Sequence, residues 1–247
     1  MILNIKRILL IFGCLSIVYI ARSQAVMISF GPTYNTTKQI VPIVNGQKGD
    51  ANTDYMFSIS YEHFFAKKPL SLFASFSKFD GYTFIFFEKG GFISYGNEIG
   101  GTGFSGVNVN RIDAGITYRI INKKRKFYLS PFVATGVQIS KKTGFEIYSE
   151  LIPINGPNYF ELEPISADPR NTTQIVPSLG FRTGFVFWKR LDIGLSFQGV
   201  YAFKPYQKMY LKYQYKGVVQ PTAEYEATGT GLFVTLGIGY RFAKLIK

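Results

Sequence analysis

The chain has 247 residues and a formal net charge of +13, and only 17% of its residues are charged. It contains 24 Phe, 17 Tyr and 25 Gly, and it has no long apolar run beyond its first residues. This composition disfavours a helical membrane protein, because each spanning helix needs about 20 apolar residues. The length is sufficient for one large domain.

The first 23 residues have the pattern of a secretory signal peptide. Lys6 and Arg7 precede an apolar stretch, Ile8 to Ile20, which is too short to span a bilayer comfortably. The segment ends in Ala21-Arg22-Ser23, with small residues at both cleavage positions. We therefore expect residues 1–23 to be removed and residues 24–247 to form one domain. Removing the three basic residues of this segment lowers the formal charge from +13 to +10.

The only cysteine, Cys14, lies inside the predicted signal peptide. A lipidated cysteine preceded by Ile-Phe-Gly is an alternative interpretation, but the bulky Phe12 and the short apolar run before it favour an ordinary signal-peptide residue. Without Cys14 the mature chain has no thiol, which excludes disulfides and thiolate chemistry.

Eight stretches after residue 24 carry apolar residues at every second position, the period of a β-strand with two different faces. In the last of them, six apolar residues alternate with three glycines, Phe233, Thr235 and Arg241. The predicted strands are Ala25–Tyr34, Tyr55–Phe65, Leu70–Ser77, Val107–Ile121, Phe127–Ser140, Gln174–Trp188, Leu191–Phe203 and Gly231–Phe242.

The connections between these stretches alternate in length. Those at about 35–53, 79–106, 141–173 and 204–228 are long, and the other three are short basic turns. In the second long connection, we expect Tyr82–Phe87 to pair with Phe92–Tyr95 as a protruding hairpin. The alternation is typical of an all-β fold, an eight-stranded antiparallel up-and-down transmembrane β-barrel with short periplasmic turns and long external loops.

The apolar faces of the predicted strands carry no formal charge, so we expect them to contact lipid. A shift of one residue would turn seven charged side chains toward hydrocarbon, where an Arg at the midplane costs about 2–4 kcal/mol. We expect these side chains inside the barrel as an ion network, with Asp192 beside Arg241 and Glu62 level with Arg119. A gated ion path is the alternative. The seven are Glu62, Arg111, Asp113, Arg119, Arg182, Asp192 and Arg241.

Large side chains are also predicted to point into the barrel, namely Phe73, Tyr128, Phe132 and Phe233. An eight-stranded barrel has an interior that side chains can fill. We therefore predict no open diffusion channel.

The single histidine, His63, is predicted to face outward near the periplasmic edge. The sequence therefore lacks the histidines that a Ser–His catalytic site or a histidine-rich metal site would need. The spacing of the carboxylates does not indicate a catalytic pair. We predict no enzyme activity, no cofactor and no metal. The positive charges are divided between the two rims, which argues against nucleic acid as a partner, and the short basic turns are expected to contact anionic lipid headgroups.

The last long connection alternates tyrosine with lysine. Tyrosine offers a large contact area with little entropy to lose, so one interpretation is an external recognition surface. The other is that the flanking strands simply continue above the membrane. The tyrosines are Tyr206, Tyr210, Tyr213, Tyr215 and Tyr225.

The export signal, the strand number, the order of long and short connections and the terminal Gly-x-Gly-Tyr-Arg-Phe together resemble small outer-membrane barrels of the OmpA type and the PorT type. This resemblance implies the outer membrane of a Gram-negative-type bacterium, with outer-membrane lipids and the barrel-assembly machinery as partners. Such families typically end on an aromatic residue, whereas Phe242 is followed by five more residues.

Three functions remain open. The leading hypothesis is a non-enzymatic outer-membrane barrel, structural or binding an extracellular partner through its long loops. The PorT-type resemblance implies instead an accessory barrel of a protein secretion or transport assembly. The third hypothesis is a lipid-modifying outer-membrane enzyme.

Overall fold

The computed structural model describes residues 24–41, 52–65, 68–81, 83–86, 101–122, 126–149, 160–162, 166–188, 190–215 and 218–242. Every regular element in these ranges is a β-strand. Within them, no helix is long and apolar enough to cross a membrane.

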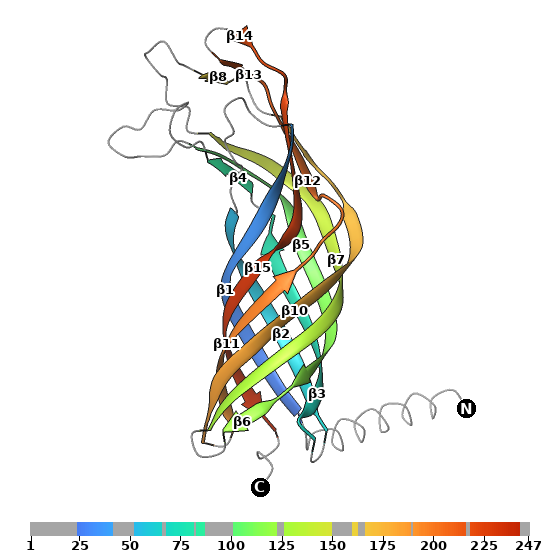
Figure 1. Ribbon diagram of the computed structural model, residues 1–247, viewed down its shortest axis with the longest axis vertical. Helices are drawn as coiled ribbons and strands as arrows, with labels where there is room; N and C mark the ends of the chain where they lie inside the picture. The colour runs from blue at the N-terminus through green and yellow to red at the C-terminus, as the bar shows by residue number, and fades with distance from the viewer. Residues whose placement is uncertain are drawn as a thin grey trace, which may run out of the picture.

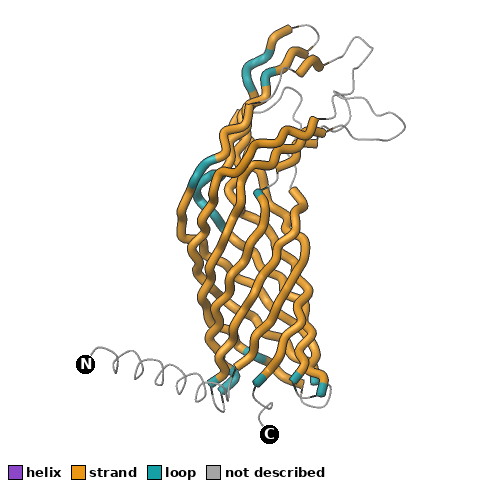
Figure 2. The backbone as a smooth tube through the Cα atoms, turned by 180° about the vertical axis from the view of Figure 1, so that it is seen from behind, coloured by secondary structure: helices purple, strands orange, loops and turns teal. Residues whose placement is uncertain are grey.

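Eight strands form a closed antiparallel barrel (Figures 1 and 2). Each pairs with the next in chain order, and the last pairs with the first. The predicted eight-stranded antiparallel fold is thereby confirmed. The strands are β1 (Gln24–Val41), β2 (Asn52–Phe64), β3 (Leu70–Asp80), β5 (Gly101–Tyr118), β7 (Phe127–Ser149), β10 (Thr172–Phe187), β11 (Leu191–Val200) and β15 (Ala223–Arg241).

One end of the barrel carries the short turns. Gln24 and Phe242 also lie there, since the Phe242 amide donates to the Gln24 carbonyl over 2.9 Å. On this side, β6 (Ile120–Asn122) continues the pairing of β5 with β7.

The opposite end is taller than the predicted strands allow, because β1, β5, β7 and β15 all continue past their predicted ends (Figure 1). Two short strands, β9 (Ser166–Pro169) and β12 (Gln207–Leu211), pair with each other, and β12 pairs with β15. We call Thr36–Val41, Ala223–Ala227, β9 and β12 the extension. A separate small sheet contains β8 (Phe160–Leu162), β13 (Tyr213–Tyr215) and β14 (Val218–Val219).

The expected protruding hairpin stays a prediction, because only its first arm contains described residues. β4 (Thr83–Phe86) lies within its first arm, and it pairs with Gly101–Phe104 of β5. β5 begins well before its predicted start at Val107, so the backbone of its first residues provides hydrogen-bonding partners for β4. The other predicted arm, Phe92–Tyr95, lies outside the described residues.

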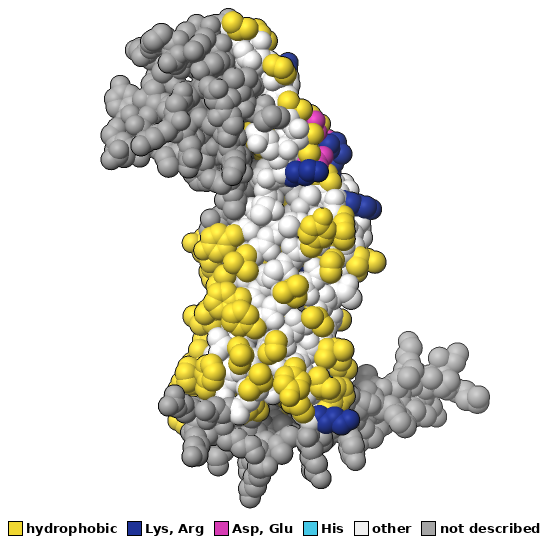
Figure 3. Space-filling model, viewed as in Figure 1, with side chains coloured by type: hydrophobic (Ala, Val, Ile, Leu, Met, Phe, Trp, Pro, Cys, Tyr) yellow, Lys and Arg dark blue, Asp and Glu magenta, His cyan; other side chains and the backbone are white. Residues whose placement is uncertain are grey.

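Side-chain exposure alternates along the barrel strands. In β15, Leu232, Leu236 and Ile238 are exposed, whereas Phe233 and Arg241 are buried. Most of the other barrel strands show the same alternation, although Leu195–Gly199 of β11 is half-buried throughout, and hydrophobic side chains lie over the outer wall (Figure 3). The predicted assignment of the two faces is therefore confirmed.

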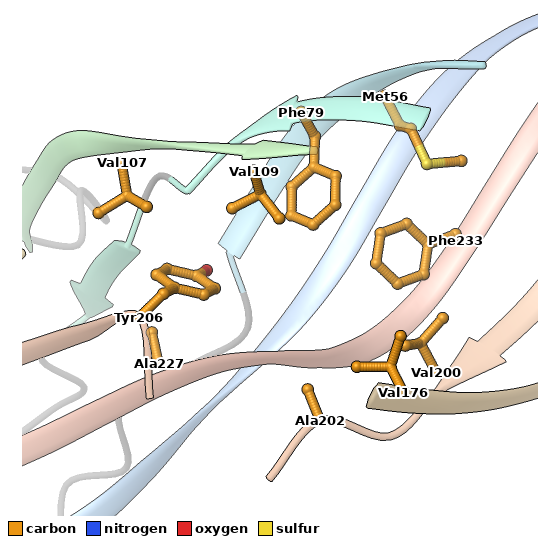
Figure 4. Packing of buried hydrophobic residues seen from close by; sticks show 10 residues of the cluster. All are labelled: Met56, Phe79, Val107, Val109, Val176, Val200, Ala202, Tyr206, Ala227 and Phe233. Atoms are coloured by element: carbon orange, nitrogen blue, oxygen red, sulfur yellow. The ribbon is translucent and has the colours of Figure 1, made fainter. Parts of the chain in front are cut away.

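A hydrophobic cluster fills the lumen on the side of the extension (Figure 4). Phe79 and Phe233 pack edge to face with 5.4 Å between their ring centroids, and Tyr206 lies near Val107 and Ala227. The cluster consists of Met56, Phe79, Val107, Val109, Val176, Val200, Ala202, Tyr206, Ala227 and Phe233.

Tyr206 reaches this cluster because the chain bends between β11 and β12. The side-chain oxygen of Gln174, on β10, accepts from the amides of Phe203 and Lys204 over 2.8 and 2.7 Å. On the other side of the bend, the Thr230 hydroxyl accepts from the Ala202 amide over 2.9 Å. Two side chains thus take the place of ladder partners for the backbone of the bend. For this reason β11 ends at Val200, before the predicted end at Phe203.

Replacing Gly136 with Ala is expected to destabilise the barrel. An added Cβ would lie 2.2 Å from Asp113 Oδ1 and 2.7 Å from the Ile112 carbonyl oxygen, so a buried carboxylate must move. Such overpacking costs about 1–3 kcal/mol. The measurement is the free energy of unfolding in urea, with the protein in lipid vesicles.

Gly199→Ala is the matched control, because its added Cβ would meet no atom closer than 3.8 Å. Equal losses of stability in the two variants would contradict the packing described around Gly136.

Candidate functional site

The lumen near the short turns contains a buried ion pair between β11 and β15. Arg241 Nε donates to Asp192 Oδ2 over 2.8 Å, and its Nη2 contacts the same oxygen. The Tyr128 hydroxyl donates to Asp192 Oδ1 over 2.7 Å. Asp192 and Arg241 are each 2% exposed. They are neighbours because Asp192 opens β11 and Arg241 ends β15, its antiparallel partner.

A second group lies beside this pair. Glu62 forms an ion pair with Arg119 over 2.8 Å, and Arg182 approaches the same carboxylate to 3.6 Å. The Ser71 hydroxyl donates to the other Glu62 oxygen over 2.6 Å. The Tyr128 ring lies between the two groups, 4.8 Å from the Arg119 guanidinium and 5.1 Å from that of Arg241. The five charged residues therefore form one cluster, which we call the lower lumen cluster.

Arg111 and Asp113 form a separate pair farther from the short turns, with 2.9 Å between Nε and Oδ2. Arg111 also donates to Gln198 over 3.0 Å and lies 4.6 Å from the centre of the Phe233 ring. This pair thus connects the polar lumen to the hydrophobic cluster.

Two aromatic side chains separate the Arg111–Asp113 pair from the lower lumen cluster. Along β3, Phe73 lies between Ser71, which binds Glu62, and Ser75, which is opposite Asp113. Phe132 of β7 packs edge to face on Phe73, with 5.3 Å between the ring centroids. The seven predicted charges therefore lie inside the barrel in two groups.

Buried ions of this kind restrain the structure because each needs its partner. The lower lumen cluster has three guanidinium groups and two carboxylates, and the removal of one partner leaves an uncompensated buried charge. Hydrogen bonds from Ser71 and Tyr128 satisfy further carboxylate lone pairs.

The single histidine lies on the outer side of the barrel, against an aromatic ring. The His63 ring packs edge to face against Phe65, with centroids 5.6 Å apart, on the outward side of β2. Among the described residues, no group of three or more His, Cys, Asp and Glu side chains could hold a metal ion.

The tyrosines proposed as a recognition surface divide into three sets. Tyr206 and Tyr225 are fully buried, so the expectation is wrong for these two. Tyr210 is half-buried, and the side chains of Tyr213 and Tyr215 lie outside the described residues. The sequence does contain a signal for this burial, since Ala223, Tyr225 and Ala227 alternate with acidic residues and continue the β15 pattern upward.

The outer face of the extension carries a cross-strand row of alternating charge. By register, Lys38 is opposite Glu226, Glu226 is opposite Lys208, and Lys208 is opposite Asp168. Lys208 Nζ lies 2.5 Å from Glu226 and 2.9 Å from Glu224. Hydrogen bonds to Glu226 and Glu224 raise the pKa of Lys208 above its ordinary value.

The outer wall therefore has two chemically different zones. Exposed apolar residues cover it from the short turns up to Tyr34, Tyr55 and Phe203, and charged residues begin above them (Figure 3). Aromatic residues at the edge of an apolar band match the interface girdles of membrane barrels.

No family model and no curated protein sequence matches the chain. Solved structures with a similar course include the outer membrane protein OprG from Pseudomonas aeruginosa, at 7% identity and a TM-score of 0.46, over 90% of this chain and 97% of that one. Ail, the attachment invasion locus protein of Yersinia pestis, has 15% identity and a TM-score of 0.39, over 89% and 98%. A major outer membrane protein from Thermus thermophilus has 9% identity and a TM-score of 0.46, over 89% and 99%. At these scores the likeness carries no functional argument.

Asp192→Ala is expected to lower the free energy of unfolding by about 3–5 kcal/mol, since it leaves the Arg241 guanidinium buried without its carboxylate. Equilibrium unfolding in urea, in lipid vesicles, measures the loss.

Asp168→Ala serves as the comparison, because it breaks a pair with Arg170 whose side chains are 49% and 41% exposed. Exposed pairs contribute about 0–1 kcal/mol. If both variants were equally stable, the buried pair would not have the structural role assigned to it.

Proposed function

We propose that this chain is a non-enzymatic β-barrel of the outer membrane, with a structural or binding role and without an open diffusion pore. The observation that carries the proposal is the division of side chains between the two faces of the wall. Between the short turns and the extension, the outward positions of the barrel strands are mostly apolar, whereas seven charged side chains point into the lumen, namely Glu62, Arg111, Asp113, Arg119, Arg182, Asp192 and Arg241.

This division fits a lipid environment for two physical reasons. In hydrocarbon, every backbone N–H and C=O needs a partner within the protein, and a closed sheet provides one without leaving an edge. A wall of exposed Ile, Leu and Phe side chains would be an aggregation hazard in water, where large apolar patches mark interaction surfaces. Lipid covers such a wall.

The filled lumen supports the absence of an open pore. The lower lumen cluster, the Phe73–Phe132 contact and the hydrophobic cluster follow one another along the barrel axis. A binding role would belong to the extension and to the small sheet of β8, β13 and β14 beyond it (Figure 1). Both lie past the apolar band of the wall.

The export signal supports the outer membrane of a Gram-negative-type bacterium as the location, with outer-membrane lipids and the barrel-assembly machinery as partners. The short turns would then face the periplasm. Phe242 is exposed at the end of β15 and is the aromatic residue that an assembly factor would meet.

Cell fractionation and gel migration test this proposal. The protein is expected in the outer-membrane fraction, and an unheated sample is expected to migrate differently from a boiled one, because folded barrels resist detergent. Identical migration in both samples, or recovery in the soluble fraction, would refute the proposal. Co-purification in a stable large complex from detergent would favour the accessory role in secretion or transport.

The lipid contact of the wall can be tested at one position. Leu236→Arg places a charge on the outward face of β15 and is expected to cost about 2–4 kcal/mol of folding free energy in vesicles. Val219→Arg is the matched control, because Val219 is 74% exposed on β14, beyond the apolar band. An equal cost at both positions would contradict the proposed membrane span.

A further inference from the structure

The upper edge of the apolar band is uneven around the barrel, and at β10 basic residues lie directly above it. Ile175 is 68% exposed and Phe203 is 63% exposed, and Tyr201 packs on Phe203 with 4.8 Å between the ring centroids. Lys204, in the bend directly after Phe203, and Lys141, on β7 next to β10, are both exposed.

Strand register places the two lysines on either side of β10. Thr173 of β10 is opposite Ile139 of β7, and Lys141 follows Ile139 by two residues on the same face. On the other side of β10, the Gln174 side chain holds the Lys204 amide over 2.7 Å and its carbonyl over 3.0 Å. In the register of β7 with β10, Lys141 lies level with Asn171, three residues before the Gln174 that holds Lys204. With strands about 4.8 Å apart and a rise of about 3.3 Å per residue, the two lysine backbones lie roughly 14 Å apart, with Thr173 between them.

Neutral donors complete this patch. Thr173 and Asn171 are exposed on β10 and just before it. The Asn171 side-chain oxygen accepts from the Lys142 amide over 2.8 Å, which leaves its NH₂ group as a donor. Ammonium, hydroxyl and amide donors together suit phosphate oxygens.

Within the described residues, the patch has no carboxylate of its own, in contrast to the charged row on the extension. Lys38 is opposite Glu226, and Lys208 binds both Glu224 and Glu226. In the part of the chain that the structure describes, neither Lys141 nor Lys204 forms an ion pair. By register, the partner of Lys141 on β5 is the neutral Asn108.

We propose that Lys141, Thr173 and Lys204 bind the phosphate-bearing headgroup of an outer-leaflet lipid whose acyl chains cover Ile175 and Phe203. The inference rests on the membrane location proposed above. A lipid fits better than a free anion because the donors border highly exposed apolar side chains of the band, so one molecule can contact both surfaces. The bend fixed by Gln174 places Lys204 at this border.

The test uses the barrel in phosphatidylcholine nanodiscs containing a minor fraction of lipid A, a doubly phosphorylated acylated disaccharide. After mild detergent extraction, native mass spectrometry measures the lipid A retained per barrel. Wild type is expected to retain lipid A in preference to phosphatidylcholine. Lys141→Gln with Lys204→Gln is expected to lower retention by roughly fivefold per lysine removed, and Lys141→Arg with Lys204→Arg is expected to preserve it.

Lys38→Gln with Lys208→Gln is the matched control, because both lysines lie at the same end of the barrel but stand beside carboxylates. Its lipid A retention is expected to equal that of wild type. Absence of a lipid A preference in wild type, or equal losses in the two glutamine pairs, would overturn the proposal.

Two further measurements separate the remaining outcomes. Saturable binding of inorganic phosphate in neutral detergent, lost in Lys141→Gln with Lys204→Gln, would show a free-anion site and overturn the lipid assignment. Unheated gel migration of each sample reports whether the barrel is folded. An unfolded wild type would count against the membrane barrel itself, whereas a folded wild type without lipid A preference would refute only the headgroup site.

Discussion

The pairing of β1 with β15 is the constraint on which the rest of the structure depends. It runs without a register shift from Ala25 opposite Arg241 to Asn35 opposite Gly231, and it converts an open sheet into a barrel. Closure gives the backbone of both strands partners on each side, which an apolar surrounding requires. It also fixes the register, because a slip of one residue would exchange the two faces and turn Arg241 outward.

From this closure follows the division of the interior. Once the charged face points inward, its groups need partners, and the end of β15 brings Arg241 beside Asp192. Farther along the lumen the charges give way to the hydrophobic cluster that Tyr206 completes. The sheet thus closes on itself, and its lumen is filled by charged side chains at one end and by hydrophobic side chains at the other. A filled lumen favours a role on the outer surfaces of the barrel over transport through its centre.

The fold was predictable from sequence because a period of two is a local signal, and the charges identified which face is buried. The Asp192–Arg241 contact could be predicted for the same reason, since both residues lie at strand ends that antiparallel pairing brings together. The bend before Tyr206 could not be predicted from the sequence, because it depends on hydrogen bonds to Gln174 and Thr230, which lie on strands distant in sequence. A recognition surface fails at Tyr225 because the other interpretation holds there: β15 continues through this residue and buries its side chain.

The central claim is that the two faces of β15 have different surroundings, lipid outside and a packed lumen inside. Single cysteines at successive positions from Leu232 to Phe242, in a background without Cys14, can carry an environment-sensitive fluorophore in lipid vesicles. The account predicts quenching by lipid-borne quenchers at every second position, beginning with Leu232. Uniform quenching along the strand, or quenching at the opposite set of positions, would contradict it.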